Sequence, residues 1–340
     1  QPSVDLIGRY AQLEGVSMEP KPIQRPHPPL WFGARVPEAM RRAVNNGDGW
    51  MEFKRSEDGG RSWSEPAPLA YSKQIYDQGI EHSIMCEKAL RSGDGTLLLF
   101  NLECRGKGWQ PLAIPTYLRS TDCGCTWEPA RPMGTQPARI WDVVLHQGCI
   151  LVLELCNDST VQWYGNLPEH HYALHVSRDK GLTFSQRSIL PFDVRGRGYG
   201  AMATLPDGRL IAYVYNINDE RHLDYATSAD GGCTWSSVQK AFMAKKIRNP
   251  QMAAFQDGFV LHGRSGNKGE GRNHFVLYTS HDGVHWDTGR YLRMGEAGAG
   301  AYSNNLIVHN PHTGAPERLL IQASHAYEEH MTNVLHWWLR

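Results

Sequence analysis

The sequence of 340 residues lacks two features that would indicate a membrane or nucleic-acid partner. Its longest apolar runs, such as residues 149–153, have the length of a strand, whereas a membrane-spanning helix needs about 20 apolar residues. Its 35 Lys and Arg residues balance 35 Asp and Glu residues. A chain with no net charge gives no bulk electrostatic attraction to nucleic acid or to a membrane surface. We therefore expect neither as a partner, and the sequence leaves the oligomeric state open.

Cysteine and histidine patterns that would bind a metal are also missing. The seven cysteines are an odd number, and Cys123 and Cys125 have no second close pair to complete a zinc site. His170 and His171, and the histidines of 330–336, show no metal-ligand spacing. We assign no metal and no cofactor. In a chain of this size we expect most cysteines to be buried free thiols, which favours a cytoplasmic location and leaves export open.

Turn-forming and aromatic residues, by contrast, are abundant. The chain has 34 Gly, 20 Pro and 11 Trp, and 41% of its residues are apolar. This composition supplies a sizeable core and many turns, and it favours an all-β fold.

One eight-residue pattern recurs along the chain. It reads SEDGGRSW at 56–63, STDCGCTW at 120–127, SRDKGLTF at 177–184 and SADGGCTW at 228–235, with a shorter copy, SHDGVHW, at 280–286. The Asp can accept bonds from backbone N–H groups of a turn, and Gly supplies a positive φ. A strand-like run precedes each copy, so we expect each to join the third and fourth strands of a four-stranded unit.

The first two strands are marked in three units by Asp-Gly pairs between apolar runs, at 94–95, 207–208 and 257–258, which is a strong hairpin signal. Residues 147–148 and 310–314 fill the same place in their own units. Four-stranded units of about 40–50 residues are the blades of a β-propeller. Five copies of the pattern and a last unit without it, residues 302–340, predict six four-stranded blades.

The S-x-D-x-G-x-T-W pattern at this spacing resembles the Asp-box (BNR) repeat of the sialidase-like six-bladed propellers, over residues 50–340. In that family the Asp boxes lie on the outer edge, so their aspartates are expected to hold turns. Residues 1–49 fit less well and are expected to complete the first or last blade. Within them, residues 26–50 weakly resemble a fragment of luciferase-like monooxygenases, and no flavin chemistry is carried over from so short a match.

Ligands of such propellers meet the starts of the innermost strands and the ends of the second strands. Here those positions are rich in charged and hydrogen-bonding side chains, and several arginines converging there indicate an acidic ligand. The candidate ligand-binding residues are Arg264, Arg197, Arg105, Asn249 and His325.

Two short segments match the sialidases residue by residue. Residues 301–303, Ala-Tyr-Ser, open the last blade as the family's A-Y-S does, and the resemblance implies that Tyr302 is the nucleophile. Residues 261–265 resemble the region that carries one arginine of the triad holding the substrate carboxylate, which implies that role for Arg264. A neutral Tyr suits an anomeric centre bearing a carboxylate, because a charged nucleophile would be repelled.

Other family features are missing. The R-I-P motif is not recognisable, and no Glu stands at the strand starts of the fourth and fifth blades. The carboxylates left as partners for base and general acid are Glu81, Glu103 and Asp142. His82 could also act as a base.

Three functions follow from these residues. The first is an exo-glycosidase of sialidase type on a terminal acidic sugar, with Tyr302 as nucleophile and Arg264 on the carboxylate. The second is a propeller-fold polysaccharide lyase on uronic acids, with His82 or Tyr302 as base and Arg neutralising the carboxylate. The third is a non-catalytic carbohydrate-binding propeller, favoured by the missing Glu and R-I-P.

Overall fold

In the computed structural model, the described part of the chain consists of β-strands and one short helix, α2 (Ala70–Tyr76). The described residues are 4–7, 12–16, 52–55, 62, 64–65, 67–79, 81–106, 112–134, 136–157, 169–266, 274–294, 302–309, 313–314, 316–324 and 334–339.

The strands alternate with short turns along the whole described chain. In order they are β1 (Val4–Ile7), β2 (Gln12–Val16), β3 (Glu52–Phe53), β4 (Ala67–Pro68), β5 (His82–Arg91), β6 (Leu97–Arg105), β7 (Leu112–Ser120), β8 (Arg131–Pro132), β9 (Ala138–His146), β10 (Cys149–Cys156), β11 (His171–Ser177), β12 (Ser185–Leu190), β13 (Arg197–Thr204), β14 (Leu210–Asn216), β15 (His222–Ser228), β16 (Gln239–Phe242), β17 (Arg248–Phe255), β18 (Gly258–Arg264), β19 (Phe275–Ser280), β20 (Arg290–Arg293), β21 (Ser303–His309), β22 (Pro316–Ser324) and β23 (Val334–Leu339).

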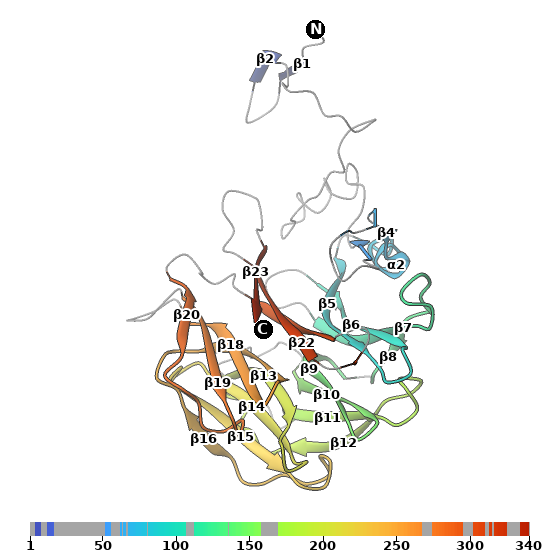
Figure 1. The fold of residues 1–340 in the computed structure, drawn as a ribbon. Helices are drawn as coiled ribbons and strands as arrows, with labels where there is room; N and C mark the ends of the chain where they lie inside the picture. Colours follow the sequence, from blue (N-terminus) through green and yellow to red (C-terminus); the bar gives the residue numbers. More distant parts are fainter. Residues whose placement is uncertain are drawn as a thin grey trace.

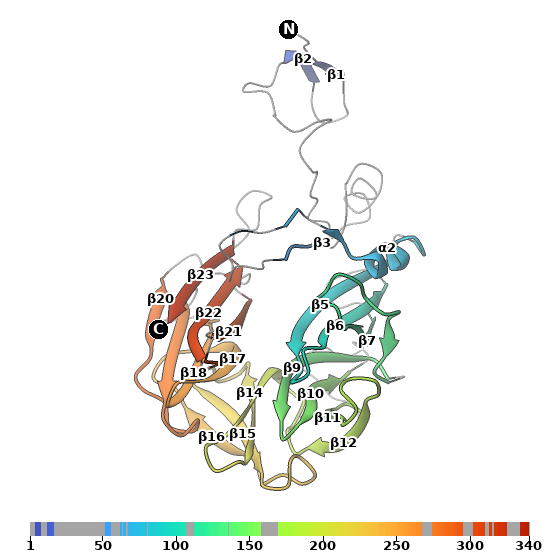
Figure 2. The same ribbon diagram turned by 45° about the vertical axis from the view of Figure 1, so that its right-hand side comes forward.

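These strands form antiparallel sheets in which each strand pairs with the next one along the chain. Four sheets have four strands, β5–β8, β9–β12, β13–β16 and β17–β20, and a fifth sheet has three, β21–β23. The sheets stand around a common centre with β5, β9, β13 and β17 toward it (Figures 1 and 2). The expected all-β propeller is therefore confirmed.

The expected number of six four-stranded blades is wrong. The described residues form five blades, because the short pair β3–β4 has only two strands and β21–β23 has only three. The segment that follows β4 folds as helix α2 and packs Tyr71 and Ile75 against Ile84 and Leu118 of the β5–β8 sheet.

The N-terminal segment is described only in part. Strands β1 and β2 pair with each other, so among the described residues they add no strand to the three-stranded last blade. Residues 26–50, which resemble the monooxygenase fragment, lie outside the described residues, and so does the first Asp box apart from Ser62.

Each of the four described Asp boxes joins the third and fourth strands of its blade, as expected. In the second box, Asp122 accepts bonds from the backbone N–H of Thr126 (2.9 Å) and from its hydroxyl (2.6 Å). The N–H of Gly124 donates to the Ser120 hydroxyl at 2.8 Å. The side chain and N–H of Thr126 lower the pKa of Asp122 to about 2, so the carboxylate stays charged. The sequence signature is thus a set of bonds within one turn.

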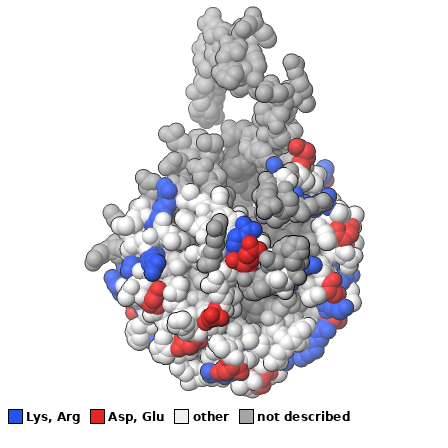
Figure 3. Space-filling view, in the orientation of Figure 1, with Lys and Arg blue, Asp and Glu red and all other residues white. Residues whose placement is uncertain are grey.

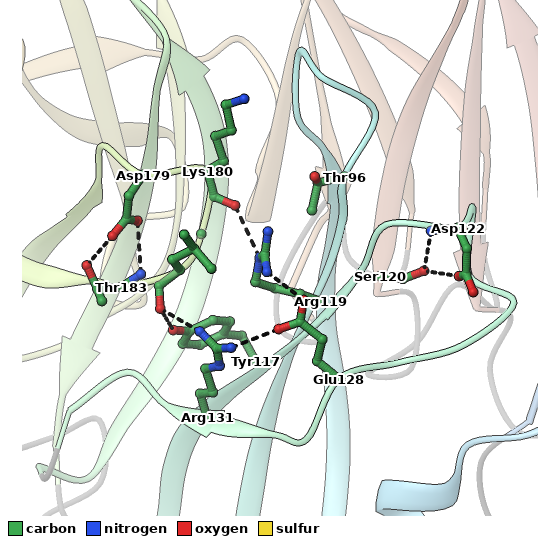
Figure 4. A network of polar contacts seen from close by, with 12 residues as sticks. Thr96, Tyr117, Arg119, Ser120, Asp122, Glu128, Arg131, Asp179, Lys180 and Thr183 are labelled. Atoms are coloured by element: carbon green, nitrogen blue, oxygen red, sulfur yellow. Dashed lines mark hydrogen bonds and ion pairs between the residues drawn. The ribbon is translucent and has the colours of Figure 1, made fainter.

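The box also contacts the neighbouring blade through its backbone carbonyls. In the third box, the Leu182 carbonyl accepts bonds from the Tyr117 hydroxyl (3.0 Å) and from Arg131 (2.9 Å), both in the preceding blade (Figure 4). The Lys180 carbonyl accepts a bond from Arg119 at 3.3 Å. Arg119 is held in turn by Glu128 at 2.6 Å. Each box therefore closes a hairpin and joins two blades.

The glycine of the box is needed for space as well as for backbone conformation. Gly232 has a φ of +88°, and a Cβ there would overlap the side chain of Leu174 in the preceding blade. A larger residue would strain the turn and push the two sheets apart.

The apolar core lies between successive sheets. Leu151, Leu153 and Leu174 of one blade, for example, pack with Met202 and Val214 of the next. Burial of these side chains between sheets is what keeps the blades face to face.

The cysteines differ from expectation. All seven are free, but only Cys104 and Cys156 are buried, while four are exposed, because Cys123, Cys125 and Cys233 fall in the exposed turns of Asp boxes. None of the described helices is long and apolar enough to cross a membrane.

We predict that Asp230→Ala will lower the melting temperature by about 2–4 °C. Asp230 accepts bonds from the N–H and hydroxyl of Thr234 at 2.9 and 2.7 Å, and its loss leaves the turn without these bonds. The matched control is Asp257→Ala, an exposed aspartate in a hairpin turn outside the boxes. Thermal unfolding followed by circular dichroism measures both, and an equal change in the two variants would contradict the role of the box.

Candidate functional site

The inner strands bring the expected ligand-facing positions to one end of the propeller. Tyr302 directly precedes β21, Arg197 and Arg248 open β13 and β17, and Arg264 ends the second strand of the β17 blade. In the pairing of β17 with β18, Arg248 lies opposite Arg264. Strand starts and second-strand ends therefore meet on one face, as the hairpin register predicted.

Tyr302 and Arg264 lie together there. The Arg264 guanidinium carbon is 5.1 Å from the centre of the Tyr302 ring, which is a cation–π distance. Arg264 is 5% exposed, and its Nε donates to the side-chain oxygen of Asn249 at 3.2 Å. Asn249 has a φ of +51°, in the left-handed region that few residues other than Gly adopt. This unusual backbone at the start of β17 aims the Asn249 amide at the arginine.

Four aromatic rings line the same region. The centre of Tyr199 is 4.2 Å from Trp141, 5.7 Å from Tyr302 and 6.2 Å from Tyr215. They come from three inner strands or their starts and from the second strand of the β13 blade, so the wall exists only once the blades are assembled.

Arg248 forms a second arginine–tyrosine pair beside the first. Its guanidinium carbon is 5.2 Å from the centre of the Tyr215 ring, and its Nη2 donates to the Tyr215 hydroxyl at 3.1 Å. Its Nε lies 3.5 Å from Glu220. Two guanidinium groups therefore lie next to aromatic faces at this end of the propeller, and one of them, Arg248, is paired with a carboxylate.

Glu87 is the carboxylate that sequence reasoning missed. It lies at an irregularity of β5, where Cys86 pairs with Asn101 and Lys88 pairs with Phe100, so that Glu87 has no partner on β6. Such a bulge redirects a side chain. Burial raises the pKa of Glu87 to about 7, against the opposing effect of Lys88 and Arg139. A register irregularity of this kind has no sequence pattern from which the position of Glu87 could be predicted.

The charge of Glu87 also raises the pKa of a nearby tyrosine, Tyr199. The pKa of the Tyr199 hydroxyl is raised well above its usual value, first by burial, then by Tyr302, to which it is hydrogen-bonded, and further by the charge of Glu87. Glu87, Tyr199 and Tyr302 therefore form one electrostatically connected group, from three different blades.

Asp142, one of the expected carboxylates, contacts backbone N–H groups and a lysine that hold neighbouring blades together. It accepts bonds from the backbone N–H groups of Met202 (2.7 Å) and Val143 (2.9 Å), and Lys88 lies 3.6 Å away. Lys88 also donates to Asn304 at 3.0 Å. Asp142 and Lys88 thus connect four inner strands, β5, β9, β13 and β21, across the centre of the propeller.

The remaining expected residues make local contacts. Arg105 binds Glu103 at 2.7 Å, and the Tyr71 hydroxyl donates to Glu103 at 3.2 Å, so the partners of this carboxylate lie on β6 and α2. Arg197 forms an ion pair with Asp224.

Two expected residues lie at the start of β5. Glu81 is exposed just before this strand, and His82 is half-buried as its first residue. His325 lies outside the described residues.

The charges on the surface are mixed in sign. On the face shown in Figure 3, the described Lys and Arg side chains are interspersed with Asp and Glu, in keeping with the zero net charge of the chain.

A repeated-blade β-propeller with Asp boxes defines a known class, and the comparison with protein families agrees. The model of the BNR repeat-like domain family matches residues 43–315. The chain belongs to this family.

Solved structures with the same fold have different stated activities. A Dyadobacter fermentans protein of unknown function is 16% identical with a TM-score of 0.62, over 87% of each chain. The intramolecular trans-sialidase of Ruminococcus gnavus is 11% identical (TM-score 0.57), over 84% of this chain and 87% of its own. The α-L-arabinanase of Penicillium chrysogenum is 14% identical (TM-score 0.54), over 85% and 84%. The chain spans 57–62% of some longer sialidases that it also matches. At these identities the likeness shows the fold.

We predict that Glu87 makes the stability of the protein fall as the pH rises toward and past 7. A carboxyl whose pKa is raised in the folded state stabilises it most below its unfolded pKa, about 4.3, and this contribution is lost as the pH rises through the folded pKa of about 7. The melting temperature of the wild type should therefore fall between pH 5 and pH 8 by more than that of Glu87→Gln. The exposed Glu65→Gln is the control, and it should follow the wild type. Parallel curves for wild type and Glu87→Gln would contradict the raised pKa.

Proposed function

We propose that the protein is a sialidase-like exo-glycoside hydrolase that removes a terminal acidic sugar, with Tyr302 as the nucleophile. The observation that carries the proposal is the position of the Arg264 guanidinium, 5.1 Å from the Tyr302 ring. A substrate carboxylate bound by the arginine brings the anomeric carbon attached to it close to the Tyr302 hydroxyl. A neutral nucleophile avoids the repulsion that a carboxylate nucleophile would meet.

Arg264 and Arg248 account for the acidic substrate. A guanidinium group binds a carboxylate with two parallel hydrogen bonds, which fixes orientation as well as charge. Arg264 is oriented by its bond to Asn249, and Arg248 by its bond to the Tyr215 hydroxyl and by Glu220, which lies 3.5 Å from its Nε. Asn249 is therefore a positioning residue in this proposal, and Arg197 and Arg105, paired to Asp224 and Glu103, contribute at the rim.

The nucleophile needs a base, and Glu87 meets this need. As Tyr302 attacks the anomeric carbon, its proton passes to Glu87. A carboxylate with a pKa near 7 can accept a proton at neutral pH and return it later. The bond from the anomeric carbon to the leaving oxygen breaks, and a covalent glycosyl–tyrosine intermediate forms.

The leaving oxygen takes its proton from a general acid at the rim of the β5 blade, where Glu81, His82 and Glu103 lie. Water then attacks the intermediate, the Tyr302 oxygen leaves and regains a proton from Glu87, and the proton of the water restores the acid. Two displacements at the same carbon retain its configuration.

The comparisons support a carbohydrate substrate without choosing one. The printed names of neighbouring structures include a trans-sialidase and an arabinanase on the same fold. Because one fold can serve several chemistries, the choice of an acidic sugar depends on Arg264 and Arg248.

We predict that Tyr302→Phe will lower kcat on an aryl sialoside by at least about 10³-fold, because removing a nucleophile removes the covalent route. Tyr225→Phe is the control, since the Tyr225 hydroxyl bonds Gln239 on the outer strand of its blade and should leave turnover unchanged. Release of the aryl alcohol measures both.

Other results of the same assay would redirect the proposal. Equal turnover by Tyr302→Phe and wild type would remove Tyr302 from the mechanism. Binding of the sialoside with no turnover by the wild type would favour the non-catalytic carbohydrate-binding function. A rise in ultraviolet absorbance on uronate polymers would favour the lyase.

We predict that Arg264→Lys will raise KM for the acidic substrate about tenfold or more, the usual effect of losing a hydrogen bond to a charged group. Lysine keeps the charge but lacks the planar pair of donors. The exposed Arg290→Lys should leave KM unchanged. Steady-state kinetics tests this, and an unchanged KM in Arg264→Lys would contradict a carboxylate-binding role.

A further inference from the structure

A cavity of about 230 Å³ lies away from the tyrosine cluster, between the β5–β8 and β9–β12 blades. One side is formed by Pro115 of β7 and by Gly134 and Gln136, which follow β8. The other side carries polar residues of the next blade. Pockets for drug-sized ligands have about 300–1,000 Å³, so this one has room for a smaller molecule.

A buried carboxylate faces this cavity, and one of its two oxygens has no hydrogen-bond partner among the described residues. Glu154, on β10, is 3% exposed and lines the cavity together with His175 of β11. Its Oε2 lies 3.1 Å from His175 Nδ1, whereas its Oε1 has no hydrogen-bond partner among the described residues. An unpaired buried acceptor costs free energy, so Glu154 is a polar group that its described neighbours satisfy only in part.

The two side chains share one face of their sheet. Glu154 pairs with Ala173 and His175 pairs with Val152, and residues paired across antiparallel strands point to the same side. Gln186, opposite His175 on β12, is exposed and completes the lining with its amide. The cavity therefore presents a carboxylate, an imidazole and two amides around a small space.

The thiol in this lining argues against a catalytic or metal-binding use. Burial and the nearby Glu154 charge raise the pKa of Cys156 to about 12, so the group stays a neutral thiol. Among the described residues, no group of three or more His, Cys, Asp and Glu side chains is arranged to hold a metal ion. The carboxylate also disfavours an anion.

The lining of the cavity includes residues near the face that carries Tyr302. Cys156 is the last residue of β10 and pairs with Ala138, the first residue of the inner strand β9. Gly134 and Gln136 lie in the connection that leads into that strand. The starts of the inner strands define the face on which Tyr302 and Arg264 meet, so both sites lie on the same face.

We propose that this cavity is a second carbohydrate-binding site, which takes one neutral sugar unit or a polyol of similar size. Hydroxyl groups both donate and accept, so they can bond the Glu154 carboxylate and the amides of Gln136 and Gln186 at once. A sugar chain bound at this site and at the Tyr302 site would contact the protein twice. The site goes beyond the proposed hydrolase activity and does not depend on it.

The experiment is a saturation-transfer NMR titration of the whole protein with D-galactose, L-arabinose and myo-inositol as probes. We expect saturable binding of at least one probe. Glu154→Gln should raise its Kd about tenfold, because it replaces a carboxyl group by an amide. Glu169→Gln, an exposed glutamate outside the cavity lining, is the matched control and should leave the Kd unchanged.

Two further variants distinguish loss of binding at this cavity from misfolding and from binding at the Tyr302 site. Gln186→Ala changes an exposed residue of the lining and should also raise the Kd, whatever Glu154→Gln does to folding. Tyr302→Phe should bind the probes as the wild type does, which separates this site from the proposed catalytic one.

The proposal is overturned if no probe saturates, if Glu154→Gln and Gln186→Ala both bind with the wild-type Kd, or if Tyr302→Phe abolishes binding.

Discussion

The turn of the Asp box is the interaction on which the rest of this propeller depends. Within each described box, a serine hydroxyl accepts a bond from a glycine N–H and the aspartate accepts bonds from the residues that follow. The same turn offers its carbonyls to side chains of the preceding blade, as Tyr117 and Arg131 show at Leu182. Because one short segment both closes a hairpin and contacts its neighbour, the angle between blades is fixed at the outer edge, and the inner strands converge as a result.

Convergence at the centre creates an electrostatic problem, since many charged side chains meet in a small volume. The charged side chains lie at two levels along the inner strands. Toward the middle of the inner strands, Asp142 and Lys88 are neutralised by each other and by backbone and amide groups, and they join the blades. Toward the strand starts, Arg248 and Arg264 lie beside the rings of Tyr215 and Tyr302. The Asp142–Lys88 pair and the arginine–tyrosine pairs therefore occupy different levels of the inner strands.

The position of Glu87 shows how a local irregularity changes chemistry. In a regular strand, alternate residues point to opposite faces, and an inner strand would present a fixed set of side chains to the centre. The bulge at Cys86 and Lys88 interrupts this alternation in β5. The redirected Glu87 is desolvated, its pKa rises to about 7, and its charge reaches the tyrosine pair. A carboxylate suited to proton transfer thus results from one extra residue in a strand.

The sequence by itself determined the class of fold, the hairpin register and the meeting of Tyr302 with Arg264. These depend on local patterns, namely the Asp boxes and the Asp-Gly turns, whose bonds lie within a few residues of one another. It could not determine the blade count, because whether a short segment such as Glu52–Phe53 grows into a full sheet depends on distant partners. Nor could it distinguish Asp142 from Glu87. Asp142 bonds Met202, 60 residues away, and Glu87 acts on Tyr199 from another blade, so only the assembled ring decided which carboxylate holds the fold and which faces the candidate site.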